Sequence, residues 1–268
     1  MLPGWSVIIP YYNEAAFLAD TLASIVAQEL RPERLILVDN ASTDGSAAIA
    51  AAFMARYPAI ATHHLSEPRP GQVNALETGI AAVDTEFVAI CDADTVYPAH
   101  HLATADAQFS RAGPDVVAMM ALDTAGDPHG RRARTRRWLY AHVVSRLLRY
   151  QCHTGGYGHA FRTAALTAAG GYATAHWSFV LFDHELMHRI FSVGRSRYHV
   201  DLWCVSSDRR KSDARTRWSL AERVLYHATP FALKDWFFYS FLQRRFAARN
   251  LSGLNLRETR AWDEPATA

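Results

Sequence analysis

The chain has 268 residues, half of them apolar and a fifth charged, and its 28 basic and 26 acidic residues leave a formal net charge of +2. This composition excludes a disordered protein, a collagen-like repeat and a small domain stapled by disulfides. The near-neutral balance also argues against a basic nucleic-acid coat, which needs a large excess of Lys and Arg. One α/β domain with a small appendage fits the length.

The cysteines and the N-terminus predict a cytoplasmic protein. Cys91, Cys152 and Cys204 are an odd number at long spacings, which fits neither a disulfide framework nor a CxxC metal site. The first residues lead into a strand-like run without the pattern of a secretory signal. No apolar run approaches the roughly 20 residues that span a bilayer.

Short apolar runs alternate with helix-length segments through the first half of the chain. The runs cover residues 6–9, 34–38, 60–64, 86–91 and 116–122. Between the first two, Leu18, Leu22 and Ile25 recur at helical spacing, and the Ala-rich residues 46–55 predict a second helix. This βαβ order predicts a Rossmann-like, mostly parallel central sheet with flanking helices.

Polar residues follow three of these strands, at the edge where open parallel sheets bind ligands. The first strand is followed by residues 10–14, the second by Asp39, and the fourth by Asp92 and Asp94. Residues 40–45 alone are typical of a turn that caps a helix. Asp39 and Asp92, however, directly end apolar strands, where a carboxylate facing the core would be costly. Together these residues predict a ligand site at the edge.

The Asp92-Ala93-Asp94 segment places two carboxylates on the same side of an extended chain. Hard cations such as Mn²⁺ and Mg²⁺ prefer carboxylate oxygens and keep positions for a substrate phosphate. The sequence has no P-loop or GxGxxG that would bind phosphate by other means. A metal-bridged diphosphate is therefore the predicted ligand.

In this order, the motifs resemble those of family 2 glycosyltransferases of the GT-A fold. Residues 7–14 resemble the opening strand motif, 24–28 its helix, and 35–46 the second strand with its base-binding turn. Residues 71–80 are similar to the GKxxAL helix, and Asp92-Ala93-Asp94 is the DxD. The resemblance covers about the first two hundred residues. It implies a GT-A fold and a bacterial, inverting enzyme.

The resemblance also implies a set of donor-binding residues. Asp39 would hold the base, Asp92 the ribose or the metal, and Asp94 the Mn²⁺ or Mg²⁺ on the donor diphosphate. Gln72 stands where the family usually has Lys. The implied donor contacts are Pro10, Tyr12, Asn13, Glu14, Asp39, Arg69, Gly71, Asn74, Asp92, Ala93, Arg209 and Arg210.

On the acceptor side, residues 155–158 resemble a glycine-rich strand, and the resemblance implies acceptor contacts at Gly155, Gly156 and Tyr157. Residues 182–189 resemble the motif whose first Asp is the catalytic base, which implies Asp183. Glu185 is the rival base and a further acceptor contact. Asp183 as a helix cap or a partner of Arg189 is the structural alternative.

Two further segments have more than one interpretation. Residues 131–137 carry five arginines, which fit a solvated helix face, a cap over the donor diphosphate with loop 123–130 as its lid, or a patch for anionic lipid. The aromatic helices after residue 219 fit either core packing or an interfacial membrane helix.

The predicted domains are a catalytic domain in two halves, C-terminal amphipathic helices and a flexible tail. The catalytic domain is 1–214, with a nucleotide-sugar-binding half 1–97 and an acceptor half 98–214, followed by helices in 215–256 and the tail 257–268.

The predicted function is that of an inverting, metal-dependent glycosyltransferase that moves a sugar from a nucleotide-diphosphate sugar to a hydroxyl on a glycan or lipid-linked acceptor. Its setting would be bacterial cell-surface glycan or glycolipid synthesis, with peripheral contact to the inner face of an anionic membrane and no nucleic-acid partner. Residues 92–96 also fit a haloacid-dehalogenase-like phosphatase with Asp92 as its nucleophile. The departures at Gln72 and Phe182 motivate a third reading, a non-catalytic scaffold that binds sugar nucleotides.

Overall fold

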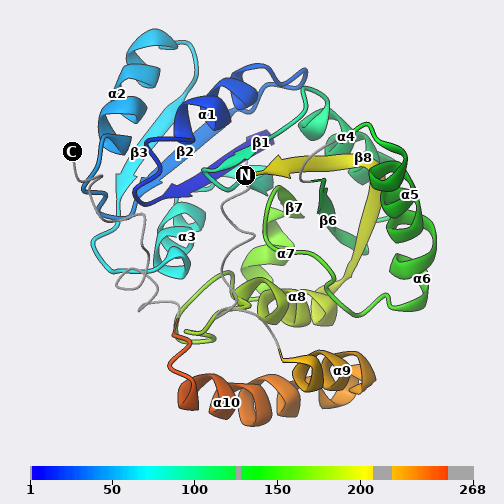
Figure 1. Ribbon diagram of the computed structural model, residues 1–268. Coiled ribbons are helices and arrows are strands. Elements are labelled where there is room, and N and C mark those ends of the chain that lie inside the picture. Colours follow the sequence, from blue (N-terminus) through cyan, green and yellow to red (C-terminus); the bar gives the residue numbers. More distant parts are fainter. Residues whose placement is uncertain (1, 125–127, 208–218, 253–268) are drawn as a thin grey trace.

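The computed structural model describes residues 2–124, 128–207 and 219–252 (Figure 1). Within these residues one eight-stranded sheet has the order β3-β2-β1-β4-β7-β6-β8-β5. The strands are β1 Leu2–Tyr11, β2 Arg34–Asp39, β3 Thr62–Ser66, β4 Thr85–Ile90, β5 Thr95–Val96, β6 Val116–Asp123, β7 His159–Arg162 and β8 Arg195–Ser206.

The sheet is parallel over β3, β2, β1 and β4, as the βαβ rhythm predicts. Its other half is mixed, because β7 runs antiparallel to both β4 and β6, and β5 runs antiparallel to β8. β6 and β8 are parallel to each other. The expected mostly parallel α/β sheet is therefore confirmed as to class, with two antiparallel strands that the apolar pattern did not predict.

Side-chain alternation in the strands builds a core on each face of the sheet. On β1, Val7 and Ile9 face a cluster completed by Leu22 of α1 and Phe53 of α2. Ile8 faces the opposite cluster, which contains side chains of α3, α7 and α8. Both faces of the sheet are thus covered by apolar side chains, and the polar side chains of the candidate site lie at the ends of the strands.

Helices connect the strands and extend beyond the sheet at the C-terminal end (Figure 1). Among the described residues, no helix is both long and apolar enough to cross a bilayer. The helices are α1 Leu18–Val26, α2 Ser46–Arg56, α3 Gln72–Ala81, α4 His101–Arg111, α5 Arg131–Leu139, α6 Ser145–Leu147, α7 Thr163–Ala168, α8 Phe182–Val193, α9 Leu220–Ala228 and α10 Gln243–Ala248, with π-helical turns η1 Tyr140–Val144 and η4 Trp236–Leu242 and a 3₁₀ turn η3 Phe231–Leu233.

The C-terminal helices pack through aromatic side chains. Phe237, Phe238 and Phe246 are fully buried against Trp177 and Tyr226. Leu233 and Trp236 remain about half exposed. Core packing, one of the two interpretations of this segment, is therefore correct for the buried aromatics. The predicted tail 257–268 lies outside the described residues.

One edge of the sheet collects the segments that matter for function. β1, β2, β3, β4, β6 and β8 all end there, because β6 is antiparallel to β7 and therefore runs in the direction of β4. The chain enters β7 at the same edge, where the amide of Gly158 donates to the Ile90 carbonyl at 2.8 Å. Residues far apart in the sequence therefore meet at this edge, as Asp94 and Ser207 do.

Candidate active site

The end of β1 is fixed to the turn after β2. Asn13 has φ of 51°, a left-handed conformation that Asn tolerates better than most residues. Its Oδ1 accepts from the amides of Thr43 at 2.8 Å and Asp44 at 3.3 Å. The amide of Glu14 donates to Ser46 Oγ at 2.8 Å. The sequence-predicted residues 10–14 and 39–45 therefore form one rigid wall.

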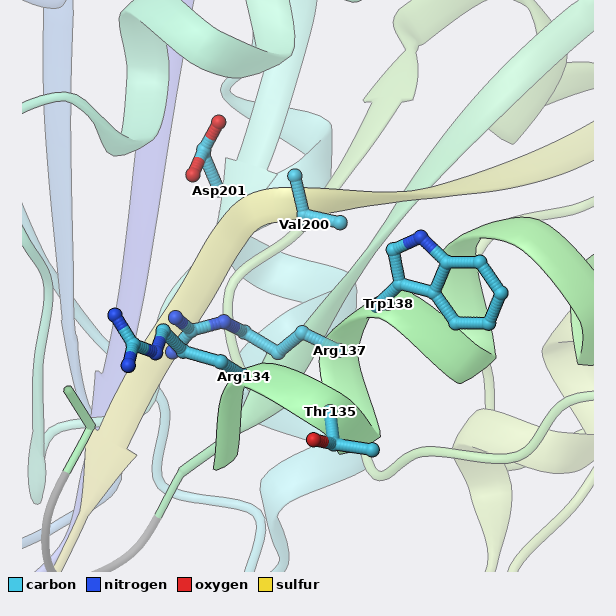
Figure 2. Close-up of a pocket in the computed structure, with 6 residues that line it drawn as sticks. All are labelled: Arg134, Thr135, Arg137, Trp138, Val200 and Asp201. Atoms are coloured by element: carbon cyan, nitrogen blue, oxygen red, sulfur yellow. The ribbon is translucent and has the colours of Figure 1, made fainter. Parts of the chain in front are cut away.

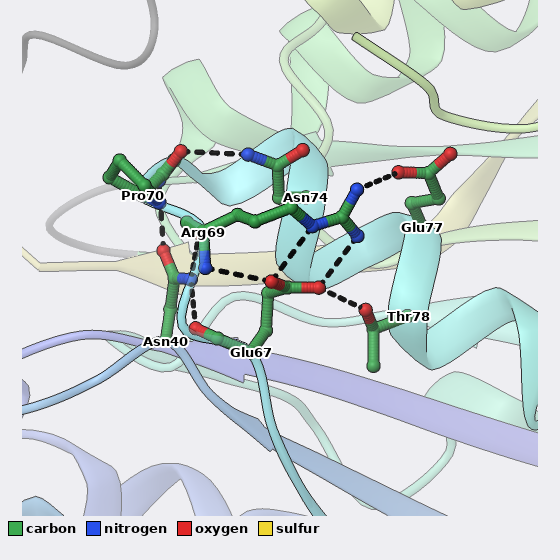
Figure 3. A network of polar contacts seen from close by, with 8 residues as sticks. Asn40, Glu67, Arg69, Pro70, Asn74, Glu77 and Thr78 are labelled. Carbon is green, nitrogen blue, oxygen red and sulfur yellow. Dashed lines mark hydrogen bonds and ion pairs between the residues drawn. The ribbon is translucent and has the colours of Figure 1, made fainter.

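A buried polar network follows the ends of β2 and β3 (Figure 3). The Asn40 amide nitrogen donates to the carbonyls of Glu67 at 2.8 Å and Arg69 at 2.7 Å, while its oxygen accepts from the Gly71 amide at 3.0 Å. Gly71 has φ of 111°, which disfavours any side chain there. The Asn74 side chain donates to the Pro70 carbonyl at 2.8 Å. The network fixes the loop that leads into α3.

Arg69, a predicted donor contact, is held by two carboxylates. Its guanidinium donates to both oxygens of Glu67, at 3.0 and 2.7 Å, and pairs with Glu77 at 3.2 Å. The Thr78 hydroxyl donates to Glu67 at 2.5 Å. The hydrogen bond from Arg69 is the main reason that the pKa of Glu67 falls from 4.5 to about 2. The sequence reasoning missed Glu67, although it directly follows β3.

The depressed pKa of Glu67 makes a testable contribution to stability. A carboxylate with a lower pKa in the folded state stabilises above its unfolded pKa, here 4.5, and loses that contribution as the pH falls toward about 2. The difference in unfolding free energy between the parent chain and Glu67→Gln should be largest above pH 4.5 and shrink on acidification. Urea unfolding at a series of pH values measures it, and a pH-independent difference would contradict this assignment.

The two DxD carboxylates lie just after β4 and are largely buried, with Asp92 7% and Asp94 5% exposed. Gln72 donates to Asp92 Oδ1 at 3.0 Å, and the Asp92 amide donates to the Tyr97 hydroxyl at 2.8 Å. Ser207, at the end of β8, donates from its hydroxyl to Asp94 Oδ2 at 2.9 Å. Gln72, which replaces the family's usual Lys, thus contacts the DxD directly. Ala93 between the two aspartates is buried.

This donor set suits a divalent cation. It offers carboxylate oxygens from a strand end, oriented by Gln72 and Ser207, and hard cations prefer such oxygens. Within the described parts of the chain, no group of three or more His, Cys, Asp and Glu forms a complete metal cage. A pair of carboxylates is nevertheless the usual protein share of a site that substrate phosphates complete.

Asp183 stands in the first turn of α8, after Leu181 in a left-handed conformation with φ of 65°. The Tyr172 hydroxyl donates to Asp183 Oδ1 at 2.9 Å. Burial and the neighbouring Asp183 raise the pKa of Tyr172 well above its usual value, so Tyr172 stays a donor. The ring of Phe182 packs edge-on against Tyr172 at 5.7 Å between centroids. Phe182, which stands where the family often has Glu, therefore packs against Tyr172, and Tyr172 in turn orients Asp183.

Gly156 lies directly against Asp183. A Cβ at this position would come within 2.1 Å of Asp183 Oδ1 and 3.0 Å of Oδ2. Two residues predicted on separate motifs, one for the acceptor and one for the base, are thus in contact. A side chain at position 156 would have to displace the carboxylate of Asp183.

Gly156→Ala should therefore displace Asp183 and lower kcat for sugar transfer by roughly 10²-fold, because a shift of about 1 Å in a reacting group has an effect of that size. The donor KM should stay within about twofold, since Gly156 is predicted to contact the acceptor and not the donor. Steady-state kinetics on both substrates, with a melting curve to check folding, test this. An unchanged kcat would show that the Gly156 contact does not position the base.

Glu185, the rival base, occupies a different environment. It is 1% exposed, and Arg189 donates to both of its oxygens, at 2.7 and 2.8 Å. The Tyr239 hydroxyl donates to the same carboxylate at 2.5 Å. Arg189 is thus the partner of Glu185 rather than of Asp183. These contacts join α8 to the C-terminal helices.

The remaining predicted site residues are Gly155 and Tyr157, which the structure describes, and Arg209 and Arg210, which it does not. A Cβ on Gly155 would come within 2.8 Å of the Tyr157 ring, so these two residues pack on each other. Burial is the main cause that raises the pKa of Tyr157, which remains a neutral phenol. Arg209 and Arg210 lie outside the described residues. The last described residue before them, Ser207, contacts Asp94.

A separate pocket of about 570 Å³ lies between α5 and β8 (Figure 2). None of its lining residues belongs to the predicted donor, acceptor or metal set. They are Arg134, Thr135, Arg137, Trp138, Val200 and Asp201.

Comparison with known proteins identifies the family to which the fold and the motifs belong. The model of the family described as "Glycosyl transferase family 2" matches residues 6–172. Glycosyltransferase GlyG of Streptococcus pneumoniae is 31% identical over 112 residues, which are 42% of this chain and 37% of GlyG. A poly-beta-1,6-N-acetyl-D-glucosamine synthase of Staphylococcus epidermidis is 32% identical over 93 residues, 35% of this chain and 22% of the synthase. The aligned segments therefore span less than half of either relative.

Among solved structures, the mannosyltransferase PcManGT of Pyrobaculum calidifontis in complex with GDP-Man and Mn²⁺ aligns with a TM-score of 0.64 at 22% identity, covering 93% of this chain and 74% of that one. S. aureus TarS in complex with UDP aligns with a TM-score of 0.61 at 19% identity, covering 91% and 72%. These likenesses confirm the GT-A fold. The family match spans well over half of the chain and includes the DxD, so the phosphatase reading of Asp92 is dropped. The chain belongs to glycosyl transferase family 2.

Proposed function

We propose that this protein is an inverting, divalent-metal-dependent glycosyltransferase that moves a sugar from a nucleotide-diphosphate sugar to a hydroxyl acceptor. The observation that carries the proposal is that three segments lie at one edge of the sheet. They are the wall of residues 10–14 and 39–45, the DxD after β4, and the loop before β7, where Gly156 contacts Asp183. The neighbours with GDP-Man and Mn²⁺ and with UDP support a donor of this class. The synthase relative supports a role in bacterial cell-surface glycan or glycolipid synthesis.

In the proposed reaction the acceptor hydroxyl oxygen attacks the anomeric carbon of the donor sugar. Its proton passes to the Asp183 carboxylate as the new C–O bond forms and the bond to the diphosphate breaks. A single displacement of this kind inverts the anomeric configuration and releases the nucleoside diphosphate. A divalent cation bound at Asp94 and Asp92 would offset the charge that grows on the leaving diphosphate.

Asp183 fits the role of the base better than Glu185. Asp183 is partly exposed and accepts a hydrogen bond from the neutral hydroxyl of Tyr172, which orients the carboxylate without adding a positive charge. Glu185 is buried and both of its oxygens accept from the Arg189 guanidinium, so the carboxylate is not open to a substrate. Glu185 is instead a structural tie between α8 and Tyr239.

The donor contacts at Pro10, Tyr12, Asn13, Glu14, Asp39, Gly71 and Asn74 remain part of the proposal. Pro10, Tyr12, Asn13, Glu14 and Asp39 belong to the wall of residues 10–14 and 39–45. Gly71 and Asn74 lie at the start of α3, where the Gly71 amide donates to Asn40 of that wall. Arg69 lies there too, and its ion pairs with Glu67 and Glu77 hold the guanidinium in place. We assign Arg69 to the rim of the same donor pocket.

Sugar transfer from a panel of uridine, guanosine and thymidine diphosphate sugars tests the proposal. Release of the nucleoside diphosphate should require Mn²⁺ or Mg²⁺ and stop with a chelator. Proton NMR of the first product formed should show the anomeric configuration opposite to that of the donor. A retained configuration, or turnover that ignores the chelator, would contradict the proposed mechanism, and binding without turnover would favour the scaffold reading.

The proposed setting is the cytoplasmic face of a bacterial membrane, with peripheral contact to anionic lipid and a lipid-linked or glycan acceptor. The lipid-patch interpretation of the arginine-rich residues 131–137 supports this part of the proposal.

A further inference from the structure

Residues 128–150 hold seven arginines and not one Asp or Glu. Residues 131–149, which comprise α5, η1, α6 and the turn after them, are called the arginine face below. Arg131, Arg132, Arg134 and Arg146 on this face are exposed. The charge is thus concentrated on one side of a chain whose overall balance is only +2.

Few carboxylates of the described residues approach the arginines of this face. Within the described residues, none of the seven forms an ion pair with a carboxylate. Arg136 donates to the Asp123 carbonyl at 2.9 Å, and Arg137 donates to the Pro128 carbonyl at 2.7 Å, which anchors α5 through neutral acceptors. Asp201 is the one described carboxylate that interacts electrostatically with Arg137. By contrast, Arg245 and Arg249 near the C-terminus both pair with the buried Glu222.

Exposed apolar side chains stand among these arginines. Leu147 is 76% exposed and Trp138 54%, and Leu139 and Leu148 are exposed as well. Protein surfaces that lie at the boundary between lipid headgroups and acyl chains typically combine Trp and Leu with Arg. A face that served only to stay solvated would gain nothing from these four side chains.

The pocket between α5 and β8 opens within this face (Figure 2). Arg134 and Arg137 line it with Trp138 and Val200, and Asp201 is the one acidic residue among the lining. Arg137 is held over the Trp203 ring, 5.1 Å from its centroid. Two guanidinium groups against one carboxylate, beside an indole and an aliphatic wall, suit a phosphate that carries an apolar part.

We propose that the arginine face docks on the headgroups of an anionic phospholipid bilayer, with one headgroup phosphate in the Arg134–Arg137 pocket and Trp138, Leu139 and Leu147 at the acyl boundary. The inference deepens the proposed function and rests on it for the lipid-linked or glycan acceptor. Charge complementarity selects this occupant, since each basic residue near such a surface adds to the attraction. Exposed leucines favour a bilayer over a nucleic acid, whose bases stack on aromatic rings rather than on aliphatic chains.

The test is sedimentation of the full chain with vesicles of phosphatidylglycerol and phosphatidylcholine, against vesicles of phosphatidylcholine alone. The parent chain should bind only the anionic vesicles, and salt should weaken the binding. Arg132→Glu with Arg134→Glu should lower the partition coefficient at least about tenfold. Leu147→Asp, at the most exposed apolar position of the face, should lower it without changing the melting temperature.

The matched control is Arg31→Glu with Arg56→Glu, which makes the same charge change at two exposed arginines in the half of the sheet around α1 and α2, far from α5 in Figure 1. Its partition coefficient should stay within about twofold of the parent value. An equal loss in both double variants would show that net charge, not this face, drives binding, and would overturn the proposal. Equal binding to both kinds of vesicle would overturn it as well.

Two further measurements on the same proteins keep the outcomes distinct. The melting shift caused by a nucleoside diphosphate should be the same in Arg132→Glu/Arg134→Glu as in the parent chain. A lost shift with intact vesicle binding would instead support a cap over the donor and overturn the lipid proposal. Binding to an RNA oligomer but not to vesicles would do the same. A failure of nucleotide binding in every protein would count against the proposed function alone, because vesicle binding is measured separately.

Discussion

Asp183→Asn should lower kcat for sugar transfer by about 10³-fold, within the range that a general base contributes. Asn keeps the size of the side chain and can still accept from the Tyr172 hydroxyl, but it cannot take the acceptor proton. The nucleotide dissociation constant should stay within about twofold, because the proposed role of Asp183 is to accept the acceptor proton and not to bind the nucleotide. Single-turnover transfer and calorimetric titration of the nucleotide measure the two quantities.

Tyr172→Phe is the matched control for this substitution. It keeps the ring that packs against Phe182 and removes only the hydroxyl that orients Asp183, so its effect on kcat should be near tenfold. Glu185→Gln should act mainly on stability, because it weakens the buried pair with Arg189. Transfer at near the parent rate in Asp183→Asn, with loss of transfer in a folded Glu185→Gln, would reverse the assignment of the base.

Asp94→Asn should weaken metal-dependent nucleotide binding by on the order of 10²-fold and remove its response to a chelator. A neutral amide is a much poorer ligand for a hard cation than a carboxylate, and the fold should survive because Asn still accepts from Ser207. Calorimetric titration of nucleotide with and without Mn²⁺ gives both values.

Ser207→Ala is the companion variant for Asp94. It leaves the carboxylate in place and removes the hydroxyl that holds Oδ2 at 2.9 Å, so nucleotide affinity in Mn²⁺ should fall about tenfold, an effect typical of residues that orient a metal ligand. Without metal, the parent chain and Ser207→Ala should bind nucleotide equally. Metal-stimulated binding that persists in Asp94→Asn would sink the assigned role of this carboxylate.

Most of the parallel half of the sheet was predictable because β1, β2 and β4 are apolar runs of ordinary length. The run at 34–38 became β2, and that at 86–91 became β4. The DxD was predictable as a site for the same reason, since Asp92 follows a clear strand end.

The antiparallel strands were not predictable from periodicity. β7 has four residues and β5 two, which is too short for a pattern, and β8 carries charged residues along its length. The contact between Gly156 and Asp183 depends on where the loop before β7 meets α8, which is a tertiary relation. Glu67 could have been identified, because it directly follows β3 and Asp39 ends the neighbouring β2, but β3 is a largely polar run and gives a weak strand signal.

The most direct test of the central claim is the melting temperature of the parent chain and of Asp94→Asn with a panel of nucleoside diphosphates, in Mn²⁺ and in a chelator. A ligand that binds only the folded state raises the melting temperature in proportion to the logarithm of its saturation. The account predicts a rise with one nucleotide in Mn²⁺ that disappears with the chelator and in Asp94→Asn. No rise with any nucleotide, or a rise that is the same in chelator and in Asp94→Asn, would contradict a metal-assisted donor site at the DxD.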